Sequence, residues 1–182
     1  MMEGRQFLAA FEQEFSRTKS MSEASIAQVS DEDLHRRINP QQNSISVVMQ
    51  HVAGNLLSRF TDFLTSDGEK PNRDRESEFA DHQLSRAQLM DIWERGWTCL
   101  FAALAPLNDE DLGRTVFIRN EPHTILKAMV RSSAHCAWHA SQIALIAKHF
   151  KGSDWQYLTI PPGGSDAFNH ARGIKSPSTS GR

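Results

Sequence analysis

Hydrophobic residues recur at helical spacing in four long stretches of the chain. The steps between them alternate between three and four residues, which places their side chains on one face of an α-helix. The pattern predicts long helices over residues 3–19, 44–65, 85–104 and 124–150, and a short helix over 31–38 that ends before Pro40. Four striped helices with scarcely any strand predict an all-α fold, a four-helix bundle.

Local signals define the ends of these helices and the segments between them. Ser85 and Gln88 form a capping-box sequence, and Gly152 follows a basic last turn. The connection 66–84 is long and its charges alternate in sign, so it is either a solvated segment or a wall or lid over a site. Residues 115–119 predict a short strand or hairpin before the last helix. We expect one bundle domain over 1–165 and a flexible Pro/Gly/Ser-rich tail over 166–182.

The last predicted helix carries polar residues where its core-facing positions should be apolar. It is apolar nearly all round, which predicts that it is buried. Four consecutive positions of one seam are nevertheless Ser132, His135, His139 and Gln142. Burying a polar group without a partner costs about 1–3 kcal/mol. The seam therefore predicts a polar centre in the bundle.

His135 and His139 are spaced i, i+4, which suits two ligands of one metal ion and also suits a hydrogen-bonded pair in the core. His51 on the second helix is a candidate third ligand, or a solvent-facing residue. Asn55 and Arg59 follow it at i+4 and i+8, and this polar strip is suited to line a cavity. Three imidazoles with open positions are typical of a catalytic metal site.

Cysteine placement argues against two other kinds of site. Cys136 stands where a His-Glu-x-x-His zinc protease has its glutamate, so a metalloprotease is disfavoured. It also lies about 100° round the helix from His135, and we interpret it as a small core residue. With Cys99 as the other cysteine, a disulfide-rich secreted scaffold is excluded and a reducing compartment is indicated.

Composition narrows the partners. The 182 residues hold 20 Lys and Arg against 22 Asp and Glu, so the net charge of −2 gives no electrostatic case for nucleic acid or an anionic membrane. The N-terminus lacks a signal-peptide core, and the longest uncharged stretch, 132–147, is too short to span a bilayer. We expect a soluble cytoplasmic protein that acts on a small-molecule substrate.

Two segments carry a family resemblance. SVVMQHVAGNLLSRF surrounds His51, and SSAHCAWHASQIALIAKHF contains His135 and His139. In their order and spacing they resemble the DinB-like superfamily, and within it an uncharacterised bacterial subgroup related to the thiol S-transferases. The resemblance spans about residues 5–165, with one departure at Ser141, where glycine is expected.

The resemblance implies a four-helix bundle that binds a divalent metal, zinc or nickel, through the three histidines and forms a homodimer. It also implies thiol-dependent S-transfer with a low-molecular-weight thiol as co-substrate. Arg59 and Arg131 are the candidate catalytic residues, because either could hold a carboxylate. Asn55 and Gln142 are candidate cofactor contacts. Apolar surface on the first helix and the aromatic face of the third also suggest a dimer.

Two other functions stay open. A metal-dependent hydrolase would use the same ion to activate water, with Glu78 or Asp81 of the connection as general base. A non-catalytic, stress-related scaffold or metal-binding protein would need the histidines only for a structural ion, or for none.

Overall fold

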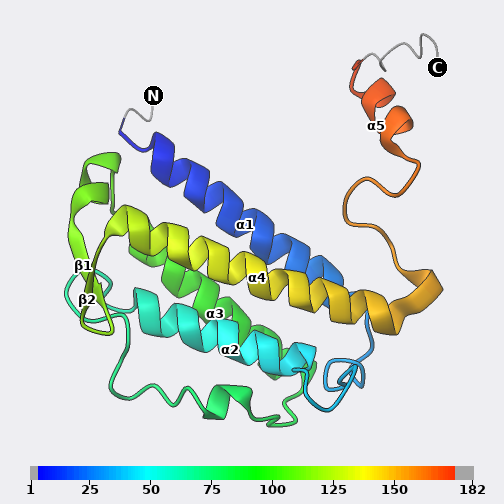
Figure 1. Ribbon diagram of the computed structural model, residues 1–182, viewed down its shortest axis with the longest axis horizontal. Coiled ribbons are helices and arrows are strands. Elements are labelled where there is room, and N and C mark those ends of the chain that lie inside the picture. Colours follow the sequence, from blue (N-terminus) through cyan, green and yellow to red (C-terminus); the bar gives the residue numbers. More distant parts are fainter. Residues whose placement is uncertain (1–3, 175–182) are drawn as a thin grey trace.

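Four long helices form the body of the protein in this computed structural model, which describes residues 4–174. They are α1 (Gln6–Ile26), α2 (Ile45–Phe60), α3 (Arg86–Leu104) and α4 (Ile125–Lys151) (Figure 1). A single hairpin of β1 (Thr115–Ile118) and β2 (Glu121–Thr124) accounts for the strands of the described residues. The prediction of an all-α fold with a hairpin before the last helix is confirmed.

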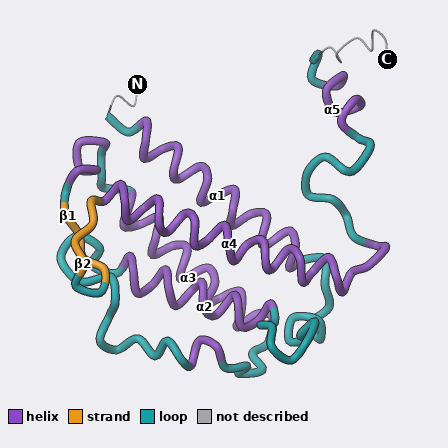
Figure 2. The backbone as a smooth tube through the Cα atoms, viewed as in Figure 1, coloured by secondary structure: helices purple, strands orange, loops and turns teal. Residues whose placement is uncertain are grey.

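The direction of the helices explains the long connection. α1 and α4 run one way along the bundle and α2 and α3 run the other way, so the neighbours α2 and α3 are parallel. Hydrogen bonds from Arg86 to the Ile26 carbonyl and from the Asp109 amide to the Gly4 carbonyl mark the antiparallel pairing of α3 with α1. The chain after α2 must therefore return along the whole bundle before α3 begins (Figure 2). This return path carries the short 3-10 helix η1 (Ser77–Phe79) past α2.

Side chains cap the N-termini of three helices. Each of these helices begins within one residue of its predicted start. The hydroxyls of Ser44, Ser85 and Thr124 each accept a hydrogen bond from a backbone amide in the first turn, and Ser85 forms the full capping box with Gln88. Gly152 ends α4 with a φ of 60°. Two shorter 3-10 helices, η2 (Asp109–Gly113) and η3 (Gly152–Asp154), follow α3 and α4.

Two predicted helix ends and one predicted helix are wrong. α1 continues to Ile26, and α2 ends at Phe60 because Thr61 is extended and Asp62 is left-handed with a φ of 48°. Residues 31–38 form turns instead of a helix. There the Ser30 and Asp33 side chains bond to each other and to local amides, a local alternative to helical hydrogen bonding.

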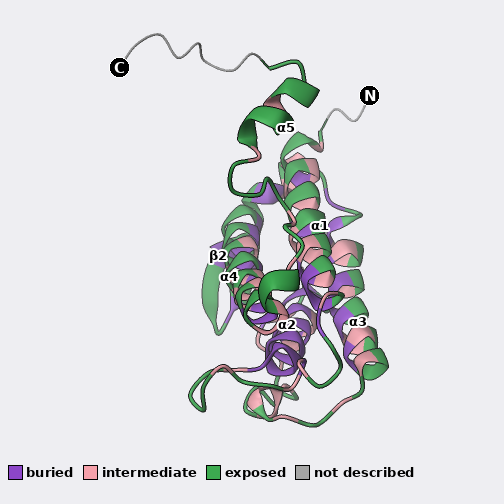
Figure 3. Cartoon of the chain, turned by 90° about the vertical axis from the view of Figure 1, so that its right-hand side faces the viewer, coloured by how far each residue is buried: buried purple, intermediate pink, exposed green. Residues whose placement is uncertain are grey.

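Burial on α3 and α4 differs from the expectation. Trp93 and Trp97 of α3 lie in the core, so the aromatic face of α3 is not surplus apolar surface. α4 is not buried all round: α1 and α2 pack against it, while another face is exposed to solvent (Figure 3). The large apolar side chains exposed on α4 are Leu126, Val130, Trp138 and Leu145.

The C-terminal segment holds one further helix. α5 (Ser165–Ala171) occupies the start of the predicted tail, 166–182, and stands away from the bundle in Figure 1. The rest of that tail from residue 175 lies outside the described residues. Along residues 4–174, no helix combines the length and apolar character needed to cross a membrane.

Candidate metal centre

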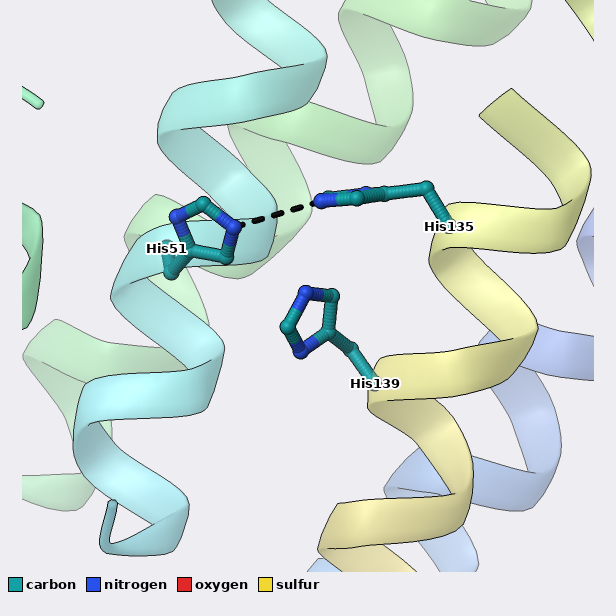
Figure 4. Close-up of side chains that lie close together, drawn as sticks. All are labelled: His51, His135 and His139. Atoms are coloured by element: carbon teal, nitrogen blue, oxygen red, sulfur yellow. Dashed lines mark hydrogen bonds between the residues drawn. The ribbon is translucent and has the colours of Figure 1, made fainter. Parts of the chain in front are cut away.

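Three histidines from two facing helices converge inside the bundle. His51 projects from α2, and His135 and His139 project from successive turns of α4 (Figure 4). Their ring centroids are 4.5 to 5.2 Å apart, and one ligand atom from each lies within 4.8 Å of the others. The Nε2 atoms of His51 and His135 are 3.2 Å apart. Two nitrogens on one tetrahedral zinc ion would lie roughly 3.3 Å apart, so this cluster could hold a metal ion.

Hydrogen bonds fix the tautomers of two of these rings. His51 Nδ1 lies 2.9 Å from Glu78 Oε2, and His139 Nδ1 lies 3.1 Å from Gln142 Oε1. Both oxygens are acceptors, so each Nδ1 carries the proton and each Nε2 keeps a lone pair. Metal-bound histidines usually donate their second nitrogen to such a partner.

The environment keeps the α4 histidines neutral, which a metal ligand requires. Burial, together with the charges that His139 and His51 would carry if protonated, lowers the pKa of His135 from 6.5 to about 3. Burial and His51 also lower the pKa of His139, against the opposing effect of its bond to Gln142. Protonating either of these two α4 histidines is therefore unfavourable at neutral pH.

Glu78 reaches the centre from η1 on the return path. Arg73 donates two hydrogen bonds to its carboxylate, at 2.7 and 2.8 Å. Burial alone would raise the pKa of Glu78, but the bonds from His51 and Arg73 outweigh it and the pKa is lowered. Gly54 on α2 makes room for this carboxylate, because a Cβ there would lie 2.4 Å from Glu78 Oε1. The Phe79 ring covers His51 at a centroid distance of 4.6 Å.

The donor set fits a divalent transition metal such as zinc. It offers three imidazole nitrogens, and two of the rings already have the outer partners typical of bound ligands. His135 Nδ1 is buried and has no hydrogen-bond partner among the described residues. The hydrogen-bonding capacity of that ring is therefore not satisfied in the protein alone.

A cavity of about 170 Å³ adjoins the histidines. It brings together the predicted residues Asn55, Arg59 and Arg131, whereas Gln142 is not part of its wall and bonds to His139 instead. Burial lowers the pKa of the Arg59 guanidinium, which pairs with Glu69. The cavity is lined by His51, Asn55, Arg59, Arg73, Arg75, Arg119, Arg131, Ser132 and His135.

Cys136 and Asp81, which the sequence analysis also considered for the site, do not line the cavity. Cys136 is a buried core residue, as interpreted from its register, and burial raises the pKa of its thiol to about 12. Asp81 bonds to His35, at 3.0 Å.

Sequence reasoning named Glu78 only as a possible base and missed Arg73 as its anchor. Both residues lie in the connection 66–84, and its many charged residues and unusual length were the features of the sequence that could have pointed to them.

Comparison with known families gives one match. The chain matches the family described as "Protein of unknown function (DUF1572)" over residues 2–164. It belongs to this family. The matched region holds the bundle, the hairpin and every residue of the metal centre, and it stops just before α5. A search of the curated proteins finds no match. The membership assigns no activity, so the function must be argued from the site.

Proposed function

We propose that this protein is a metal-dependent enzyme whose divalent ion, zinc or nickel, is held by His51, His135 and His139. The observation that carries the proposal is the convergence of three imidazoles beside a polar cavity. Three protein ligands leave a position for water or substrate, which is the pattern of catalytic zinc sites.

The reaction we propose is thiol S-transfer with a low-molecular-weight thiol, as the DinB-like resemblance implies. A bound divalent metal lowers the pKa of a coordinated thiol and so supplies a thiolate near neutral pH. The chain supplies the remaining functions. Glu78 and Gln142 orient ligand rings, Phe79 shields His51 from water, and Arg59 and Arg131 face the cavity where a substrate carboxylate would bind. The buried thiol of Cys136 takes no part.

Hydrolysis is the weaker alternative because its candidate bases are engaged. The Glu78 carboxylate accepts hydrogen bonds from His51 and Arg73, and Asp81 bonds to His35. A general base must reach the water that it deprotonates. Both cysteines are free, which supports a reducing, cytoplasmic location.

Metal content tests the site itself. Untagged protein should be purified and its metal measured by elemental analysis, with the His135→Leu variant beside it and His149→Leu, an exposed histidine of the same helix, as control. We expect near-stoichiometric metal in wild type and in the control, and none in His135→Leu. If wild type holds no metal after incubation with zinc and with nickel, the metal-dependent enzyme is wrong and the non-catalytic scaffold remains as the alternative.

Turnover tests the reaction. Monochlorobimane gains fluorescence when a thiol displaces its chloride, so the rate is followed with several low-molecular-weight thiols and with metal-loaded or chelated protein. We expect metal-dependent acceleration that is lost in His135→Leu and kept in His149→Leu. Metal binding without acceleration for any thiol, combined with metal-dependent ester hydrolysis, would favour the hydrolase instead.

A further inference from the structure

The cavity beside the histidines is strongly cationic. Five arginines line it, and they come from four separate parts of the chain: Arg59 from α2, Arg73 and Arg75 from the return path, Arg119 from the hairpin turn and Arg131 from α4. Among the described residues, no aspartate or glutamate forms part of this wall. Like charges gathered around one small space repel each other, so the arrangement calls for an anionic partner.

The carboxylates behind the wall only partly balance these charges. A single oxygen, Glu69 Oε2, is shared by Arg59 at 3.1 Å, Arg73 at 3.3 Å and Arg119 at 3.1 Å. Glu78 pairs with Arg73 a second time and also with His51. With Glu76, which pairs with Arg75, three carboxylates thus face a group of five guanidinium ions.

Arg131 in particular has an imidazole, and not a carboxylate, as its hydrogen-bond partner. Its guanidinium Nη1 lies 3.4 Å from Nε2 of the buried His123. His123 Nδ1 lies 3.0 Å from the Glu121 carbonyl, so Nδ1 carries the proton and Nε2 accepts from Arg131. The partner is therefore a neutral ring. Arg75 pairs with Glu76, whose side chain is 87% exposed, and water screens such a pair.

Gathering these arginines costs stability. The Arg59 side chain is only 9% exposed and shares its carboxylate partner, Glu69, with Arg73 and Arg119, and burying a cation is unfavourable unless it is fully paired. Arg119 and Asn120 form the hairpin turn with φ of 56° and 62°, in the left-handed region that turns usually fill with Asn-Gly. Asp67 accepts hydrogen bonds from both of their amides, at 2.8 and 2.7 Å, and so holds the turn. Strain of this kind is concentrated at functional sites.

We propose that this cavity binds a small dianionic substrate or co-substrate, which carries either two carboxylates or a phosphoryl group. Guanidinium forks match both groups bidentately. The volume of about 170 Å³ is below the roughly 300–1,000 Å³ of sites for drug-sized ligands, so the anion, or the part that enters, is small. Its role as substrate rests on the proposed function, but the arginines would bind it without the metal.

Calorimetric titration of metal-stripped, full-length protein tests this proposal. The probes are succinate, inorganic phosphate and acetate, at low and high salt. Succinate or phosphate should bind at least tenfold more tightly than acetate, and binding should weaken with salt. Comparing succinate with phosphate identifies the preferred oxyanion. Failure of both to bind, or equal binding of acetate, would overturn the proposal.

Charge-removing variants locate the binding. Arg131→Gln and Arg75→Gln should each lower the affinity for the tighter-binding probe at least tenfold. Circular dichroism should show that the helical content is unchanged. The controls Arg17→Gln and Arg95→Gln remove exposed arginines outside the cavity and should stay within twofold of wild type. Equal losses in all four would show only general charge attraction and would contradict a built site.

The two proposals fail separately. If wild type binds no metal but metal-stripped protein binds succinate or phosphate in an Arg131-dependent way, the metal enzyme is wrong and the anion site stands. If metal binds and thiol turnover occurs but neither anion binds, the anion site is wrong and the proposed function stands.

Discussion

Two parts of α4 differ from an ordinary bundle helix: a polar seam on its inner face and several large apolar side chains on its outer face. The inner face, toward α2, carries Ser132, His135 and His139, whereas the outer face exposes large apolar side chains such as Trp138 and Leu145. A surface helix normally turns its apolar stripe inward and its polar residues to water. The rest of the inner face is ordinary core, with buried apolar residues such as Met129 and Ile143 packed within this chain, so the polar seam and the exposed apolar residues are the two features to explain.

The polar seam fits the candidate metal centre, because His135 and His139 converge with His51 on one point and His139 has an outer partner in Gln142. For the outer face, we propose the homodimer that the resemblance implies, with a second copy of the chain covering the apolar residues of α4. The strip from Leu126 to Leu145 extends roughly 28 Å along the helix, long enough for helix-on-helix packing between subunits.

Replacing the central inner residue should separate function from folding. His135→Leu is expected to abolish metal binding while the free energy of unfolding changes by no more than about 2 kcal/mol, because an apolar side chain suits the buried position. Metal analysis and thermal unfolding by circular dichroism measure the two effects.

A chelator provides the control for this variant. Chelated wild type should unfold as cooperatively as chelated His135→Leu. If the variant does not fold, or if chelation alone unfolds wild type, the ion is structural and the enzyme proposal loses its main support.

Removing the carboxylate that orients His51 should weaken metal binding, although all three histidine ligands remain. Glu78→Gln is expected to lower metal affinity by roughly 10- to 100-fold, as loss of an outer partner does elsewhere. Competition with a chromophoric chelator measures the affinity, and Glu76→Gln, an exposed neighbour, is the matched control. Gly54→Ala should also lower the metal affinity, because the added Cβ displaces the Glu78 carboxylate. Unchanged affinity in both variants would show that Glu78 does not position His51.

A charge on the outer face should act on assembly and not on the metal. Trp138→Lys is expected to weaken the homodimer at least tenfold, because it places a cation in an apolar interface, while metal content stays at the wild-type level. Light scattering at several concentrations gives the oligomeric state. Phe117→Lys changes an exposed aromatic residue on the hairpin and serves as control. A wild type that is monomeric at micromolar concentration would reject the dimer.

The sequence predicted the helices and the three histidines well because both depend on local spacing. Ser85 with Gln88 marks the start of α3, and His135 and His139 share a face of α4 by their i, i+4 separation. The prediction that α4 is buried all round was wrong, because the apolar residues of its outer face have the same helical spacing as core residues and only the folded structure shows that they are exposed. Glu78 and Arg119 could not be placed, since their positions depend on the path of a non-helical segment and on a left-handed turn. Those are properties of the folded chain.

The smallest expected effect is a pH dependence of stability in the metal-free protein. The folded pKa of His135, about 3, lies below its unfolded value of 6.5. As pH falls below 6.5, the unfolded chain therefore binds a proton that the folded chain does not, and the free energy of unfolding decreases. One such group contributes at most about 1.4 kcal/mol per pH unit. Urea unfolding between pH 7 and 5, with chelator present, avoids the titration range of the carboxylates. Wild type should lose stability more steeply than His135→Leu across this range, and parallel profiles would show that His135 is not held neutral by the inner face of α4.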